Sequence, residues 1–274
     1  MIRFCLCLLA FALLQPSPAA EPRHLEIACV GDSITAGYGY PGSYREFLFK
    51  KLSAAGVVPE FVGRFADKRP ENAPWAKHSG LAGWTILGGA VGYEVGGKSG
   101  QKEGMERNVP ELIKDLVTHG KTRAGYAGPD YLPLLIGTND MNKIEDPTHK
   151  PPWLGAKGAP ERLKTLLRLT IDHLDQAGFN GTCIVIQTIP DITGNTENVR
   201  AFNDAIASPA SGPLGMERKY AQRILLADTR FKEPNSAILT TDKIHPNQAG
   251  AEVIGSGFAD AILDHLRLKA GNTR

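Results

Sequence analysis

The stretch "LEIACVGDSITAGYGYPG", residues 25–42, passes from an apolar run into a loop rich in glycine. The apolar part, residues 25–31, has the length and composition of a buried β-strand. The loop permits two interpretations. From Gly37 onward, its glycines have the G-x-G-x-x-G spacing of a dinucleotide-binding loop. From Gly31 it reads Gly-Asp-Ser, which places Ser33 just past the end of a strand, where a nucleophile could stand.

The dinucleotide interpretation fits the rest of this stretch poorly. Such a loop has its first glycine directly after the strand, whereas six residues, "GDSITA", separate Val30 from Gly37, and Pro41 interrupts the turn. The serine, in turn, lacks the glycine two positions later that a G-x-S-x-G nucleophile elbow requires, because Thr35 stands there. The stretch therefore favours a nucleophilic serine outside the α/β-hydrolase fold, and a nucleotide-dependent oxidoreductase is the disfavoured alternative.

The rest of the chain alternates between apolar runs and amphipathic helical patterns. We predict strands over residues 25–31, 59–65, 131–137, 182–190 and 223–231. We predict helices over residues 43–56, 109–120, 159–178, 195–208 and 246–270, and a short helix near residues 84–92. Nearly all-apolar strands with helices between them indicate a parallel sheet covered on both faces. No linker or repeat divides the chain, so we expect one α/β domain over residues 21–274.

The first twenty residues have the pattern of a secretory signal peptide. Arg3 supplies a positive charge, an apolar run follows over residues 4–14, and Ser17 and Ala19 are small residues spaced for cleavage. The run is shorter than the roughly 20 apolar residues that a transmembrane helix needs. We predict a signal peptide over residues 1–20 and a secreted or periplasmic mature protein without stable membrane association. A buried first helix is the alternative.

Composition excludes some partners. The formal net charge is +2 and no basic block is present, so we expect no nucleic-acid partner. Cys29 and Cys183 lie inside apolar runs, where thiols commonly serve as small hydrophobic side chains, and a disulfide between them is the less favoured alternative. No group of residues has the spacing of a metal site, and we expect no metal and no cofactor.

Polar motifs lie where a parallel sheet gathers its active site, at the carboxyl ends of the strands. "GDS" follows the first predicted strand, "GTND" (137–140) follows the third, and "DKIHPN" (242–247) precedes the last helix. A serine hydroxyl attacks when a base takes its proton, histidine can be that base, and a carboxylate on the other ring nitrogen orients the imidazole. Asp242 and His245 are three residues apart, so one turn can aim both side chains at one place.

An acyl-transfer intermediate also needs hydrogen-bond donors for its negatively charged oxygen. The side-chain amide of Asn139 can supply one donor, and backbone N–H groups at Ser33 and at a glycine can supply others. The candidate glycine is Gly83, in "HSGLAGWTI" (78–86), because glycine lets the backbone approach a ligand closely.

These motifs, in this order and over about residues 25–266, resemble the SGNH (GDSL-type) hydrolase superfamily. The resemblance implies a three-layer α/β/α flavodoxin-like fold with a five-stranded parallel sheet. It also implies a catalytic set with Ser33 as nucleophile, His245 as base, Asp242 as its orienting partner, and Asn139 and Gly83 as oxyanion donors. Gly83 is preferred to Gly80 because it matches the family's Gly-Trp pair.

The second motif departs from that of many SGNH hydrolases, which carry an asparagine and a Gly-Asp pair there. "HSGLAGWTI" is instead similar to the block of family 3 carbohydrate esterases, which remove acetyl groups from xylan. "IGTNDMN" (136–142) and "GAPERLKTLL" (158–167) also look like that branch. The resemblance implies a secreted serine esterase that hydrolyses acetyl or other short-chain acyl esters on a carbohydrate such as acetylated xylan. A lipase, arylesterase or thioesterase on small acyl substrates and a non-catalytic carbohydrate-binding protein remain alternatives.

Two residues next to the motifs are candidates for substrate binding. Trp84 could stack on a sugar ring or serve as a structural aromatic, and Tyr38, Tyr40 and Tyr93 have the same ambiguity. Asp32 is the other candidate, but because it precedes the serine, the favoured interpretation is that it ties the loop through backbone hydrogen bonds.

Overall fold

A computed structural model of the chain describes residues 23–67, 72–88, 91–95, 98–102, 104–121, 123, 125–142, 155–191, 196–208, 214–229 and 235–271. The predicted signal peptide, residues 1–20, lies outside these ranges. Among the helices within them, none combines the length and the apolar character needed to cross a bilayer.

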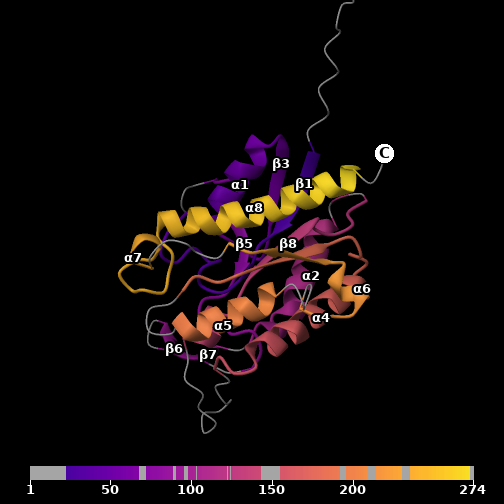
Figure 1. Cartoon of the computed structure of the whole chain (residues 1–274). Coiled ribbons are helices and arrows are strands. Elements are labelled where there is room, and N and C mark those ends of the chain that lie inside the picture. The colour runs from indigo at the N-terminus through magenta and orange to yellow at the C-terminus, as the bar shows by residue number, and fades with distance from the viewer. Residues whose placement is uncertain are drawn as a thin grey trace, which may run out of the picture.

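A largely parallel sheet forms the middle layer of the fold (Figure 1). Its five main strands, in sheet order β3-β1-β8-β9-β10, are β3 (Val57–Val62), β1 (Arg23–Ala28), β8 (Tyr131–Leu135), β9 (Cys183–Gln187) and β10 (Ile224–Ala227). The two-residue strand β2 (Val30–Gly31) continues β1 beyond Cys29 and also pairs with β8. All of these pairings are parallel, and each main strand coincides with a predicted one. The α/β fold class expected from the sequence is confirmed.

Helices cover both faces of the sheet (Figure 1). One face carries α1 (Ser43–Ala54) and α8 (Gln248–Gly271), and the other carries α2 (Val109–Gly120), α4 (Ala159–Gln176) and α5 (Thr196–Ala207). These are the five long helices that the sequence predicts. Short helices that it does not predict are η1 (Met105–Arg107), α3 (Thr138–Met141), α6 (Arg218–Ala221) and α7 (Asn235–Ile238).

Helices α1 and α8 pack closely against each other. A Cβ atom added at Gly255 of α8 would lie 2.3 Å from the main-chain oxygen of Tyr44 in α1, so only glycine allows this approach. Next to this contact the rings of Tyr44 and Phe258 lie 5.1 Å apart between centroids, and Lys51 pairs with Asp260 at 2.7 Å. This contact joins the segment after the first strand to the last helix.

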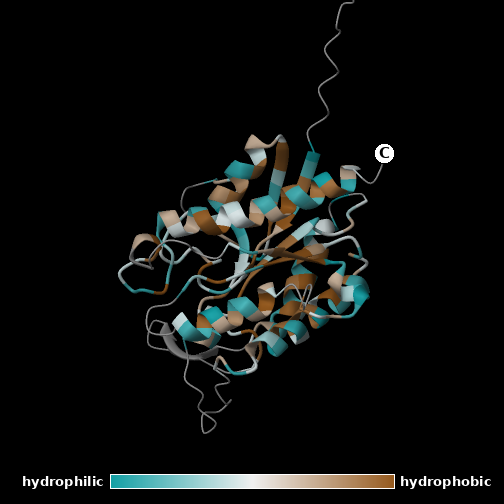
Figure 2. Ribbon diagram, viewed as in Figure 1, coloured by the Kyte–Doolittle hydropathy of each residue, from teal (hydrophilic) through white to brown (hydrophobic). Residues whose placement is uncertain are grey.

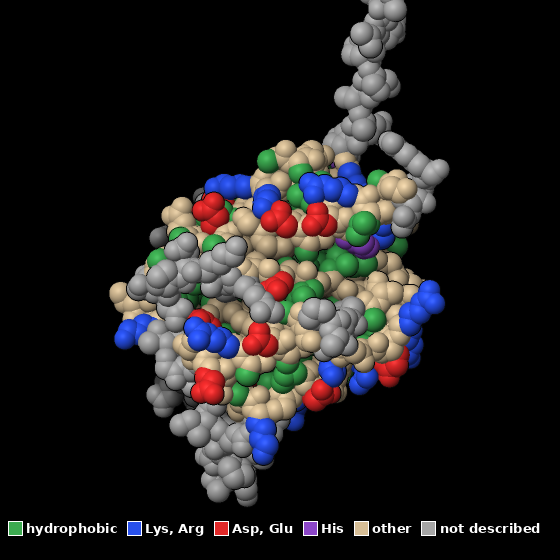
Figure 3. Space-filling model, viewed as in Figure 1, with side chains coloured by type: hydrophobic (Ala, Val, Ile, Leu, Met, Phe, Trp, Pro, Cys, Tyr) green, Lys and Arg blue, Asp and Glu red, His purple; other side chains and the backbone are tan. Residues whose placement is uncertain are grey.

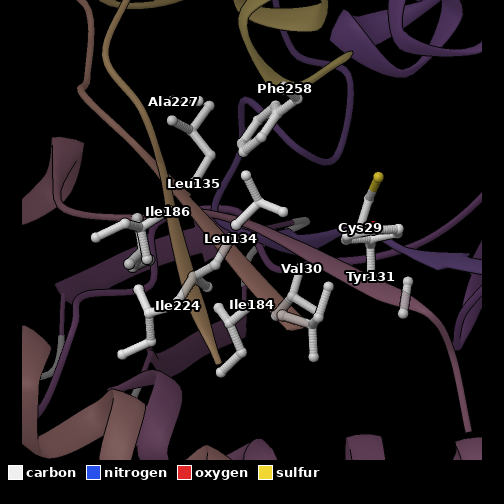
Figure 4. Close-up of a cluster of buried hydrophobic side chains, with 14 of the residues drawn as sticks. Cys29, Val30, Tyr131, Leu134, Leu135, Ile184, Ile186, Ile224, Ala227 and Phe258 are labelled. Atoms are coloured by element: carbon white, nitrogen blue, oxygen red, sulfur yellow. The ribbon is translucent and has the colours of Figure 1, made fainter. Parts of the chain in front are cut away.

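The apolar side chains of the strands form the core (Figure 2). Figure 4 shows buried side chains of neighbouring strands, among them Val30, Leu134 and Ile186, which are in register with one another. Phe258 of α8 belongs to the same core but lies on the opposite face of the sheet, the face on which Tyr131 contacts His265 of α8. Both cysteines in the described part of the chain are buried and free, which confirms their interpretation as small hydrophobic side chains. Burial raises the pKa of the Cys29 thiol to about 12, so this thiol stays protonated and unreactive.

The face of the molecule that carries α8 shows both signs of charge interspersed (Figure 3). A groove of about 740 Å³ runs along α8 and β10 on this side. Two of its acidic residues are paired, Asp260 with Lys51 and Asp264 with Arg267. The negative charges of Asp260 and Asp264 in this groove are therefore partly neutralised by neighbouring basic side chains.

The sheet is larger than the five strands expected, and one predicted helix is wrong. Strand β5 (Lys77–Gly80) pairs in parallel with β2, and β4 (Phe65–Ala66) pairs antiparallel with β5. Where a helix near residues 84–92 was expected, the chain has bends and then the hairpin of β6 (Val91–Val95) and β7 (Lys98–Lys102). The first hydrogen bond of such a helix, from the N–H of Gly88 to the oxygen of Trp84, is absent. The oxygen of Trp84 accepts the side-chain amide of Asn139 at 2.8 Å instead, and the N–H of Gly88 donates to Glu106 at 2.8 Å.

Candidate active site

The loop after β2 presents Ser33 at the carboxyl end of the sheet. A Cβ atom at Gly31 would lie 2.1 Å from the main-chain oxygen of Leu135, so only glycine lets this backbone pass so close to β8. Asp32 is fully buried, and its Oδ1 accepts a 2.9 Å hydrogen bond from the N–H of Ile34. The structure thus places Asp32 inside the loop that holds Ser33, without exposed surface for a substrate, because its carboxylate is needed to close the turn.

Ser33, His245 and Asp242 form one hydrogen-bonded chain. The Nε2 atom of His245 lies 2.8 Å from Oγ of Ser33, and its Nδ1 atom lies 2.7 Å from Oδ2 of Asp242. Residues 212 positions apart thus meet at the carboxyl end of the sheet. This is the geometry in which an imidazole can take a proton from a serine while a carboxylate holds its tautomer.

The carboxylate of Asp242 is held by more than the histidine. Its Oδ1 atom accepts hydrogen bonds from the main-chain N–H groups of Ile244 and His245, each at 2.9 Å, and from the hydroxyl of Thr240 at 2.7 Å. Partial burial opposes ionisation, but the hydrogen bonds from His245, Ile244 and Thr240 outweigh it and hold the pKa of Asp242 well below its usual range. This carboxylate therefore stays charged beside the imidazole.

The glycines of the 37–42 stretch allow the serine loop to pack on the histidine. Gly39 has a φ of +90°, and a Cβ atom there would lie 2.4 Å from the main-chain oxygen of Pro246 and 2.8 Å from Cβ of His245. The neighbouring Tyr38 is 49% exposed, and its ring centroid lies 5.5 Å from that of His245. Gly39 is therefore explained by the close contact of this loop with His245 and Pro246, and a dinucleotide-binding loop is not needed to account for it.

The second glycine-containing segment, residues 78–86, lies beside the serine strand and is held at several points. Its residues Ser79 and Leu81 donate main-chain hydrogen bonds of 2.8 Å to the oxygens of Cys29 and Gly31. Farther along, the side-chain amide of Asn139 donates a 2.8 Å hydrogen bond to the main-chain oxygen of Trp84. The "GTND" motif thus fastens this segment next to the loop of Ser33.

Gly83, and not Gly80, has its backbone N–H available for a ligand. The N–H of Gly80 donates to Nδ1 of His78 at 3.0 Å, and a Cβ atom at Gly80 would lie 2.4 Å from the nitrogen of Ala36. Gly83 has a φ of +78°. Within the described part of the chain, the N–H groups of Gly83 and Ser33 have no acceptor. The local backbone therefore favours the choice between the two glycines made from the sequence.

Sequence reasoning missed the buried ion pair that supports this segment. Asp140 is almost fully buried, and its Oδ1 atom lies 2.9 Å from Nη2 of Arg162 on α4. Burial raises the pKa of Asp140 to about 6 despite the attraction of Arg162. An ion pair between residues 22 positions apart leaves no pattern that a reader of the sequence could detect.

The other aromatic candidates differ in what they offer a ligand. Trp84 is half-buried and packs against the core, and its main-chain oxygen is bonded to Asn139. Tyr40 donates its hydroxyl to Glu46 at 2.9 Å at the start of α1. The side chain of Tyr93 lies outside the described residues. Tyr38 is thus the tyrosine of this set whose exposed ring adjoins the histidine.

One group of possible metal ligands lies elsewhere in the described residues. The carboxylates of Glu26 and Glu60 and the ring of His119 have ligand atoms within 4.8 Å of one another. Arg123 already forms ion pairs with both carboxylates, at 2.6 Å in the case of Glu60. The guanidinium thus supplies the positive charge that a cation would bring.

The sequence model of the GDSL-like Lipase/Acylhydrolase family matches residues 29–253, which include every residue of the hydrogen-bonded chain at Ser33. The chain belongs to this family. As a GDSL-like acylhydrolase, it carries its Gly-Asp-Ser motif at residues 31–33 and its histidine at the entrance to the last helix.

Relatives of this GDSL-like acylhydrolase include esterases. A multidomain esterase of Ruminococcus flavefaciens is 27% identical over 263 residues, which cover 90% of this chain and 29% of that protein, so the chain spans less than a third of that relative. A family 3 carbohydrate esterase of Clostridium thermocellum superposes with a TM-score of 0.60 at 20% identity, covering 90% of this chain and all of that one. One from Talaromyces cellulolyticus gives 0.61 at 18% identity, covering 89% and 98%. The two structures share the fold of this acylhydrolase.

Proposed function

We propose that this GDSL-like acylhydrolase is a serine esterase that removes acetyl or similarly short acyl groups from a carbohydrate. The observation that carries the proposal is the continuous chain of hydrogen bonds from Ser33 through His245 to Asp242. Family membership and the esterases among its relatives support carboxylic ester hydrolysis as the reaction class. No metal or cofactor is needed for this chemistry.

Each step of the reaction uses a group already in position. His245 Nε2 takes the proton of Ser33 as Oγ attacks the ester carbonyl. The imidazolium then gives this proton to the sugar oxygen as its bond to the acyl carbon breaks, so that the sugar leaves with a free hydroxyl. Asp242 stabilises the imidazolium. The N–H groups of Ser33 and Gly83 and the second amide hydrogen of Asn139 donate to the oxyanion. Water, activated by His245, then attacks the acyl-serine, and the carboxylic acid leaves.

The carbohydrate part of the proposal is supported by the surface next to the histidine. The exposed ring of Tyr38 provides an apolar plane beside His245, and sugar rings bind to such planes through their C–H faces. Two structures with the same fold are family 3 carbohydrate esterases. We therefore assign Tyr38, in preference to the half-buried Trp84, to the sugar side of the site.

Secretion is part of the same proposal. A polymeric carbohydrate lies outside the cell, and the charge, apolar run and small residues of residues 1–20 have the pattern of a cleavable signal. The esterase domain then comprises residues 21–274.

Acetate release from a panel of esters tests the proposal. We expect the purified protein to release acetate from acetylated xylan or acetylated monosaccharides, and Ser33→Ala to release none while retaining the fold. Best activity on long-chain esters would indicate a lipase instead. If a fluorophosphonate failed to label Ser33 of the wild type, the protein would be a non-catalytic carbohydrate-binding protein.

A further inference from the structure

A buried ion pair next to the active site ends on a histidine that the reaction does not use. Arg45 of α1 is fully buried, and its Nη2 atom lies 2.5 Å from Oδ2 of Asp67. Its Nη1 atom donates to the main-chain oxygens of Trp75 and Ala76. The other carboxylate oxygen of Asp67 lies 3.3 Å from Nε2 of His78, which is 5% exposed. Arg45, Asp67 and His78 thus form one polar chain, in which Arg45 and His78 are buried and Asp67 is partly exposed.

The far side of His78 contacts the segment that carries the proposed oxyanion donor. Its Nδ1 atom accepts the N–H of Gly80 at 3.0 Å, which requires an unprotonated Nδ1 and places the ring proton on Nε2, facing Asp67. The next residue, Leu81, donates its N–H to the oxygen of Gly31, two positions before Ser33. The histidine therefore joins a fixed charge pair to the backbone that lies between Ser33 and Gly83.

We propose that His78 is a positioning residue, which holds the backbone of residues 80–83 in its catalytic geometry and releases it when Nδ1 is protonated. This inference rests on the proposed function, because it assigns a catalytic use to the N–H of Gly83. An imidazolium has no acceptor. Its Nδ1–H would face the N–H of Gly80, two donors would be opposed in a buried place, and the backbone would have to move.

The groups around His78 set its pKa, and therefore the pH at which the backbone is released. The charged groups that face it are Asp67 and Arg45, and the ring of Phe65 packs on it at 5.7 Å. The guanidinium of the adjacent Arg64 is directed toward Asp115 and Asn108 instead. Burial lowers the pKa of His78 below its ordinary value, Arg45 adds to this effect, and Asp67 opposes it. The histidine is thus neutral at neutral pH and changes state on the acid side.

Two matched substitutions separate the two hydrogen bonds of the ring. His78→Asn places an amide oxygen near the position of Nδ1, so it can accept the N–H of Gly80, and it cannot be protonated. His78→Gln extends its amide toward the position of Nε2, where it can still donate to Asp67, but it withdraws the acceptor from Gly80. A merely structural histidine would not distinguish these variants by their catalytic behaviour.

The test is the pH dependence of kcat and kcat/KM, measured on the best ester substrate of the wild type from about pH 4.5 to about pH 8. At neutral pH we expect His78→Gln to lose roughly 10-fold or more in kcat with little change in KM, since removing a whole oxyanion donor costs about 10²–10³. His78→Asn should recover most of that loss. Its acid limb, plotted as log kcat/KM against pH, should be less steep than that of the wild type by about one proton.

Several results would overturn the inference. These are wild-type kcat in His78→Gln, an unchanged acid limb in His78→Asn, or losses in both variants that simply follow their melting temperatures. If neither variant folded, the wild type alone would decide, because an acid limb with the slope of a single proton contradicts a second titrating histidine. A wild type that hydrolyses no ester would refute the proposed function, whereas an active wild type with indifferent variants would refute only the role of His78.

Discussion

The side-chain amide of Asn139 donates one hydrogen to the main-chain oxygen of Trp84 at 2.8 Å, which leaves its second hydrogen for a ligand. The next residue, Asp140, accepts the N–H of Ile86 at 2.9 Å. Two adjacent residues of the "GTND" motif therefore fasten the segment that carries Gly83. In the proposed mechanism, the side chain of Asn139 thus both supports this segment and donates to the oxyanion.

Asn139→Ala should lower kcat by about 10²–10³, because it removes a donor from the oxyanion and loosens Trp84 at the same time. Steady-state kinetics on an acetyl ester measure this effect. Asn139→Asp is the matched control, since it keeps the shape of the side chain but offers only acceptors when ionised, and it should be at least as impaired. A loss below about 10-fold in Asn139→Ala would exclude the amide from oxyanion stabilisation.

Asp242→Asn should lower kcat by about 10²–10⁴, because an amide facing Nδ1 of His245 favours the wrong tautomer. The variant can still accept the N–H groups of Ile244 and His245 through its remaining oxygen, so we expect little change in fold, which circular dichroism can verify. Since its hydrogen bonds hold the pKa of Asp242 well below the usual range, wild-type activity should show no titration of this carboxylate near its ordinary pKa of about 3.9. Wild-type rates in the variant would remove Asp242 from the mechanism.

Tyr38→Ala should lower kcat/KM on acetylated oligosaccharides by about 10-fold, equivalent to about 1.4 kcal/mol of lost binding. Tyr38→Phe keeps the ring and should retain most of the activity. Ethyl acetate, which has no ring to stack, is the control substrate and should be hydrolysed at similar rates by all three proteins. Equal losses on both substrates would show that Tyr38 acts on His245 and not on the sugar.

Asp32→Asn should change how stability depends on pH. Burial raises the pKa of Asp32 from 3.8 to about 7, so between these values the folded protein keeps a proton that the unfolded chain has lost. The wild-type free energy of unfolding therefore decreases as the pH rises through this window. The asparagine can still accept the N–H of Ile34 and does not titrate.

Melting temperatures of both proteins at about pH 5 and about pH 8 measure this difference. The melting temperature of Asp32→Asn relative to that of the wild type should increase with pH. Each kcal/mol of difference in the free energy of unfolding corresponds to roughly 2–4 °C. Asp140, another buried carboxylate with a raised pKa, is present in both proteins. Its charge contributes to the raised pKa of Asp32, so the difference between the two proteins includes the repulsion between these two carboxylates. Parallel melting curves across the range would show that Asp32 does not ionise in the folded protein.

The strands and long helices could be predicted because the residues that they bury are apolar and recur with the spacing of a strand or a helix. Strand β9 is apolar at four of its five positions, and α4 repeats its apolar residues with helical spacing. Strand β5, "KHSG", has neither property, because its buried side chains are polar. It pairs with β2 through the main chain, and His78 and Ser79 accept hydrogen bonds. The apolar Trp84, Ile86 and Leu87 have the spacing of a helix. The side chains of Asn139 and Glu106, which take the groups of its first hydrogen bond, come from other parts of the chain.

In the candidate site, too, the residues with a local sequence pattern could be predicted and those held by long-range contacts could not. Asp242 and His245 could be paired from their spacing, and the order of the motifs led to Ser33. The supporting residues Arg45, Asp67 and Arg162 could not be found, because an ion pair between distant positions has no local signature. His78 stands inside a motif that was recognised, but its burial between Asp67 and Gly80 is known only from the fold.

The packing of α8 on α1 has a consequence for when this molecule becomes active. Ser33 lies just before α1, His245 lies just before α8, and Gly255 allows the two helices to meet. In the proposed mechanism, Ser33 has no base until α8 has packed against α1, even when the central strands are formed. A partly folded chain is therefore expected not to hydrolyse esters, and activity begins only when the final helix is in place.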